Sequence, residues 1–122
     1  IIINKEGEYE IARFPDGTIR SAFANTSPGW NWIFTGPAVA PLNQWTHVAV
    51  VYESGIVKTY INGVLTHTHN GTGAIGDIDT TRNEFRIGGR QVVSQHFQGR
   101  IDEVRVYNRA ISASEITQLM NN

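Results

Sequence analysis

The sequence predicts an all-β protein, an antiparallel two-sheet β-sandwich with one short helix at its C-terminal end. Short runs rich in Val, Ile, Thr, Tyr, Phe and Trp alternate with turn signals, a rhythm typical of sandwiches and barrels. An Asn-Gly pair separates two of these apolar-alternating runs. A helix-capping pattern stands near the end of the chain.

The size and composition of the chain limit the functions that it can have. A chain of 122 residues suits one hydrophobic core, so we expect a single domain over residues 1–122. The formal net charge of −1 creates no field that favours nucleic acid. Without cysteine the chain has no disulfide or thiol chemistry. Its apolar runs are far shorter than the ~20 residues of a membrane helix, so we expect no membrane insertion.

The strands are predicted from alternation between turn signals. They cover residues 1–4, 8–14, 18–24, 30–35, 45–53, 56–62, 64–68, 85–89 and 97–107. Asn62-Gly63 joins two of them in a hairpin, because a type I′ turn needs positive φ at both central residues. Ser112 and Glu115 form a capping box that begins the helix.

The run 97–107 carries a carboxylate among apolar side chains. Asp102 alternates onto the same face as Val104 and Val106, which we expect to be buried. A buried carboxylate must be paired, hydrogen-bonded or bound to a cation, since burial alone is too costly.

Four segments together resemble the laminin G-like domains of the concanavalin A-like group. They are residues 45–52 (Trp-Thr-His-Val-Ala-Val-Val-Tyr), 60–64 (Tyr-Ile-Asn-Gly-Val), 85–89 (Phe-Arg-Ile-Gly-Gly) and the strand and helix of 97–116. The resemblance implies a jelly-roll sandwich that serves as a non-catalytic module of a secreted or cell-surface protein.

The same resemblance implies further strands before residues 1–4. We therefore expect a domain truncated at its N-terminus, cut from a longer polypeptide with neighbouring domains. A sheet that lacks such strands exposes unpaired backbone, and we expect this edge to allow self-association.

Asp102 is the predicted metal residue. In calcium-binding members of the group an aspartate of a similar closing strand binds a structural Ca²⁺, and Asp102 matches that position. The alternative is a structural carboxylate held by loop N–H groups, or by Arg86 or Arg100.

Trp30, Trp32 and Phe34 share one face if residues 30–35 form a strand. Exposed aromatic rings would stack on sugar rings, whereas the usual role of such a row is to fill the sandwich interior. We expect at least two of the three to be interior and Trp30 to reach the surface. The predicted ligand-binding residues are Trp30, Asn31 and Arg90, the last two as polar partners for a glycan.

Glu6, Glu8 and Glu10 alternate as catalytic carboxylates of glycosidases do. However, Lys5-Glu6-Gly7 is typical of a turn, so we expect Glu8 and Glu10 on a solvated outer face and no enzyme.

The sequence therefore favours a carbohydrate-binding module that targets a larger extracellular protein. A structural or protein-interaction module is the second hypothesis. A fragment of a glycoside hydrolase or lyase is the third.

Overall fold

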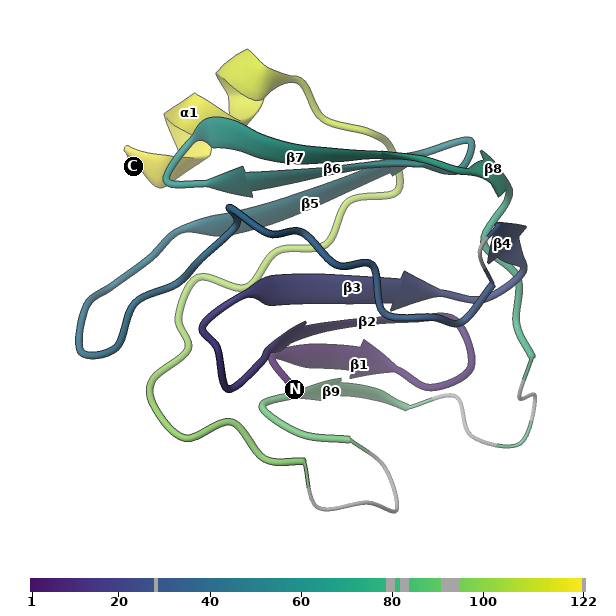
Figure 1. The fold of residues 1–122 in the computed structure, drawn as a ribbon, viewed down its shortest axis with the longest axis horizontal. Helices are drawn as coiled ribbons and strands as arrows, with labels where there is room; N and C mark the ends of the chain where they lie inside the picture. Colours follow the sequence, from purple (N-terminus) through teal and green to yellow (C-terminus); the bar gives the residue numbers. More distant parts are fainter. Residues whose placement is uncertain (28, 79–80, 82–83, 91–94, 122) are drawn as a thin grey trace.

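The computed structural model describes residues 1–27, 29–78, 81, 84–90 and 95–121. One antiparallel sheet has the order β3-β2-β1-β9, a second has the order β5-β6-β7, and β4 pairs with β8 (Figure 1). The strands are β1 (Ile3–Lys5), β2 (Tyr9–Arg13), β3 (Ile19–Phe23), β4 (Thr26–Ser27), β5 (Val48–Glu53), β6 (Ile56–Ile61), β7 (Val64–Asn70), β8 (Thr72–Gly73) and β9 (Phe85–Ile87).

The core lies where the two larger sheets meet. Phe23 of β3 packs with Ile33 and with Val57 of β6, and all three side chains are buried. Tyr52 of β5 places its ring 5.1 Å from that of Phe23, between centroids. Side chains from two stacked sheets thus bury one another, which confirms the predicted β-sandwich.

The single helix of the described chain, α1 (Ala113–Met120), begins where the sequence predicts. The Ser112 hydroxyl accepts a hydrogen bond from the Glu115 backbone N–H at 3.2 Å, and the Glu115 carboxylate accepts one from the Ser112 N–H at 3.0 Å. Ile116 is fully buried, and the helix lies beside β6 and β7 on the side away from the four-stranded sheet (Figure 1). Since two turns are unstable alone, this docking holds the helix.

Most of the predicted strands are confirmed, with ends that differ by a few residues. The prediction for residues 30–35 was wrong: this segment pairs with β3 through one isolated bridge, between Ile33 and Ser21. Ile33 faces the core, so Trp32 and Phe34 lie on the opposite side of the chain, out of the sandwich interior. Trp30 has φ of +50°, which extended strands do not adopt.

The strand predicted at 97–107 is also absent from the described sheets. Val104 and Val106, which the alternation predicts to be buried, are 37% and 58% exposed. The physical reason is that alternation alone does not make a strand: a neighbouring strand must supply hydrogen bonds and apolar cover. Residues 101–107 belong to no strand, and in the view of Figure 1 their trace passes between β3 and β5 before it continues to α1.

The β6–β7 turn gives a first prediction. Asn62 and Gly63 have φ of +50° and +80°, and a Cβ on Gly63 would meet Met120 Cε at 3.1 Å. We expect Gly63→Val to lower the free energy of unfolding by about 1–3 kcal/mol, because it adds both backbone strain and a contact with α1. Urea denaturation measures the loss. Asn62→Asp, which tolerates positive φ and keeps a side-chain oxygen, is the control; an unchanged midpoint for Gly63→Val would contradict the prediction.

Candidate functional site

The outer face of the four-stranded sheet carries two clusters of polar and aromatic side chains. Phe23 points to the core, so residues of opposite parity point away from it. Asn4 pairs with Glu10, and Glu10 with Ala22, so these side chains share the outer face. Arg20 of β3 belongs to the same face, because Ala22 lies two residues further along its strand.

Four side chains on this face form a carboxylate cluster, defined as Asn4, Glu6, Glu10 and Arg90. The Arg90 guanidinium donates to both carboxylate oxygens of Glu6, at 3.0 and 2.9 Å, and lies 3.8 Å from the Glu10 carboxylate. Asn4 Nδ2 donates to Glu10 at 3.3 Å. Asn4, Glu6 and Glu10 are 0%, 5% and 2% exposed. A bidentate guanidinium is the partner that a buried carboxylate requires.

The burial changes the protonation chemistry of the cluster. Removal from water raises the pKa of the Glu10 carboxyl, while Arg90 and the Asn4 amide act in the opposite direction. The hydrogen bonds to Glu6 raise the pKa of Arg90, so its guanidinium stays charged. Burial in the cluster therefore opposes the ionisation of Glu10.

The sequence predicts a solvated Glu10, and this was wrong. The turn at Lys5-Glu6-Gly7 is confirmed, since the Glu8 N–H donates to the Lys5 carbonyl at 2.9 Å. Glu10 does point to the outer face, but Arg90 and Asn4 cover it. No local signal could have shown this, because Arg90 reaches Glu10 from a segment far away in the sequence.

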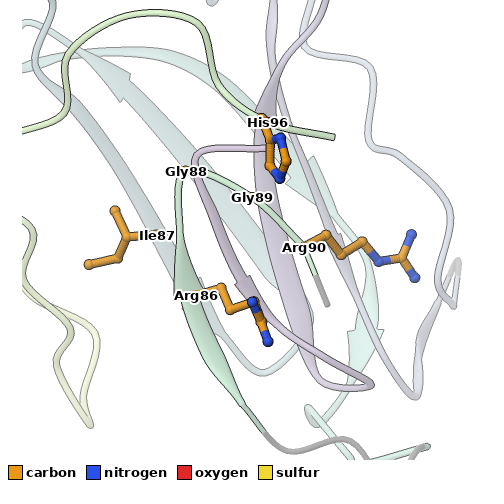
Figure 2. Close-up of a pocket in the computed structure, with 6 residues that line it drawn as sticks. All are labelled: Arg86, Ile87, Gly88, Gly89, Arg90 and His96. Atoms are coloured by element: carbon orange, nitrogen blue, oxygen red, sulfur yellow. The ribbon is translucent and has the colours of Figure 1, made fainter. Parts of the chain in front are cut away.

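A depression of about 250 Å³ adjoins the cluster, beyond the end of β9. In Figure 2 the Arg86, Arg90 and His96 side chains lie to one side of this strand, while Ile87 points to the other. Guanidinium and imidazole groups donate hydrogen bonds, so the depression suits a ligand rich in acceptor oxygens. It is lined by Arg86, Ile87, Gly88, Gly89, Arg90 and His96.

An aromatic cluster occupies the β3 side of the same sheet and consists of Phe14, Arg20, Trp32 and Phe34. Trp32 meets Phe14 edge to face, with ring centroids 5.1 Å apart and planes at 78°. The Arg20 guanidinium carbon lies 4.2 Å from the Phe14 centroid and 4.8 Å from that of Phe34. Phe34 is 62% exposed. The arrangement offers an accessible ring beside a guanidinium.

The predicted binding residues Trp30, Asn31 and Arg90 fall into two places. Trp30 is half-buried, and its backbone N–H donates to the Phe23 carbonyl at 2.9 Å; Asn31 is exposed next to it. Arg90 lies beyond β9 in the carboxylate cluster. Within the described part of the chain, no hydrogen bond, ion pair or ring contact joins Arg90 to Trp30 or Asn31. Their joint role in ligand binding stays a prediction.

Asp102 lies on the surface, in the segment outside the sheets. Its Oδ1 accepts a hydrogen bond from the Glu103 N–H at 2.8 Å, as in the alternative of a carboxylate held by a loop N–H group. A calcium ion takes about six to eight oxygens. Among the described residues, no group of three or more His, Asp or Glu side chains is placed to hold a metal ion. Structural calcium at Asp102 stays a prediction.

Comparison with known proteins agrees with this fold. A family model described as the concanavalin A-like lectin/glucanases superfamily, of the laminin G type, matches residues 1–117. The chain belongs to this superfamily. Its predicted laminin G-like character is thereby confirmed.

Two relatives of this laminin G-like domain are informative. An adhesion G-protein coupled receptor V1 of Danio rerio is 28% identical over 87 residues, which cover 65% of this chain and 1% of the receptor. The crystal structure of an S-layer domain-containing protein (residues 221–444) from Clostridium thermocellum is 28% identical, with a TM-score of 0.54. That match covers 84% of this chain and 51% of the crystallised one, so the domain corresponds to part of each relative. In the described part of the domain, no helix is both long and apolar enough to span a membrane.

The buried Glu10 carboxyl gives a prediction about pH. Because its pKa is raised in the folded state, Glu10 favours folding below its unfolded pKa, and this contribution is lost as the pH rises through the folded pKa. Glu10→Gln replaces the carboxylate with a neutral group. We expect it to raise the free energy of unfolding at pH 7 relative to the parent, with a smaller gain at pH 4.

Chemical denaturation at the two pH values measures this difference. Glu53→Gln, at an exposed position of β5, is the matched control and should show no such trend. A gain from Glu10→Gln that is equal at pH 4 and pH 7, or a loss that grows toward pH 7, would contradict the assignment.

Proposed function

We propose that this laminin G-like domain is a non-catalytic glycan-binding module of a larger extracellular protein, and that the aromatic cluster is its binding surface. The observation that carries the proposal is the exposed ring of Phe34 beside the Arg20 guanidinium, on a sheet face. Sugar rings present C–H faces that pack on aromatic rings, and their hydroxyls accept hydrogen bonds from guanidinium groups. An aromatic ring and a guanidinium that lie side by side can therefore contact the same sugar unit.

The geometry of the aromatic cluster supports this role. Trp32 holds Phe14 edge to face, and Phe14 in turn underlies Arg20, so the guanidinium is fixed rather than free. An ion pair of 3.0 Å from Arg20 to Asp16 adds to this restraint. A pre-positioned donor loses less conformational entropy when a ligand binds.

The carboxylate cluster supports a non-catalytic role. A glycosidase needs a carboxylic acid and a carboxylate that both reach the scissile bond. Here Glu6 and Glu10 are buried, and the Glu6 oxygens are engaged by Arg90. Glu6 is held by Arg90 and Glu10 is buried beside it, an arrangement that favours a structural over a catalytic role for the two carboxyls.

The relatives favour an extracellular setting. One is named as an adhesion receptor and the other as an S-layer domain-containing protein. A module attached to such proteins would hold them at a glycan surface. A structural or protein-interaction role is the competing hypothesis, and the absence of any glycan affinity would favour it.

Substitution of Phe34 tests the proposal. We expect the parent domain to bind at least one insoluble polysaccharide or arrayed glycan, and Phe34→Ala to weaken that binding about tenfold, which corresponds to ~1.4 kcal/mol of lost stacking. Val64→Ala, at an exposed apolar position of β7, is the matched control. Binding that survives Phe34→Ala but is lost in Trp30→Ala would move the surface to Trp30 and Asn31. A parent that binds no glycan would overturn the proposal.

A further inference from the structure

Residues 101–107 form a stretch of backbone that belongs to none of the described strands. Within the described part of the chain, no backbone hydrogen bond joins them to another segment. Every residue from 102 to 107 is exposed, and Val104, Val106 and Tyr107 are apolar. In Figure 1 this yellow-green stretch leads to α1 without an arrow of its own. Such a stretch offers a row of donors and acceptors to any incoming strand.

The backbone of this segment is also strained. Glu103 has φ of +53°, a conformation that residues with a Cβ rarely adopt. Strand pairing would require an extended conformation at Glu103, which would relieve this strain. The residues of the segment also favour a strand, since Val, Ile and Tyr have high strand propensity.

We propose that a second copy of this chain covers the segment, by antiparallel pairing of residues 101–107 with the same residues of the partner about a twofold axis at Val104. In that register Glu103 lies opposite Arg105 of the partner subunit, and Arg105 opposite the partner's Glu103. Ile101 lies opposite the partner's Tyr107 on the same face of the ribbon. This face is thus complementary to itself, with charged pairs at the centre and apolar pairs at the ends.

The charges select the register. An axis one residue earlier would place Glu103 opposite itself, and an axis one residue later would do the same with Arg105. Like charges directly opposite each other destabilise a strand pair. In the single chain, Arg105 and Glu103 pair with each other at 2.8 Å across an exposed surface. The dimer replaces each of these local ion pairs with one between subunits.

Charge-reversal variants, measured alone and as a mixture, test the proposal. We expect the parent to show a monomer–dimer equilibrium in analytical ultracentrifugation. Glu103→Arg alone sets arginine against arginine, and Arg105→Glu alone sets glutamate against glutamate. Each should weaken the dimer about tenfold or more. An equimolar mixture of the two variants restores both opposite-charge pairs, so we expect it to form a heterodimer.

Three further measurements complete the test. Circular dichroism should be unchanged in both variants, and Glu53→Arg, a matched reversal on exposed β5, should leave the dimer intact. Hydrogen exchange should protect the amides of residues 101–107 in the parent dimer but not in either variant alone. A parent that stays monomeric at all concentrations would overturn the proposal. It would favour pairing of residues 101–107 with a strand of a different polypeptide. Single variants that dimerise as the parent does, or a mixture that remains monomeric, would overturn the proposal as well.

Discussion

The alternation of side chains across the four-stranded sheet determines most of what this domain can do. One face of the sheet must be apolar, because it packs on the second sheet through Phe23. The other face is thereby free to carry polar and aromatic groups without weakening the core. The carboxylate cluster and the aromatic cluster both occupy this face, the first toward the β9 edge of the sheet and the second toward the β3 edge. A shift of one residue in the register of β2 would exchange Glu10 with Tyr9 and destroy both the core and the cluster.

The carboxylate cluster shows how the sheet tolerates buried charge. Glu6 follows β1, Glu10 lies within β2 and Arg90 follows β9, so one guanidinium ties three segments together. Such a pair gains little net energy over an apolar pair, but loss of one partner leaves a buried charge uncompensated. The cluster therefore favours a single arrangement of β1, β2 and the chain beyond β9. That arrangement shapes the depression lined by Arg86, Arg90 and His96.

The binding surface and the unpaired segment place different demands on the same fold. A glycan surface needs rings held in place, and the contacts among Phe14, Arg20 and Trp32 supply this rigidity. Among the described residues, the segment 101–107 makes no backbone hydrogen bond to another segment, and a second chain would supply such partners. The two features lie on different parts of the chain. A dimer would present two aromatic clusters at once and increase avidity for a repeating polysaccharide.

The sequence by itself determined the sandwich, the Asn62-Gly63 turn and the capping box at Ser112, because each depends on residues close together in the chain. It could not predict the burial of Glu10, since Arg90 reaches it from a distant segment. It also could not decide which of Ile33 and Trp32 faces the core: both stand in one apolar run, and the bridge from Ile33 to Ser21 sets the parity. Residues 97–107 have the alternation of a strand, yet pairing needs a neighbour. Local preference is encoded in neighbouring residues, whereas burial and pairing depend on what the folded chain brings alongside.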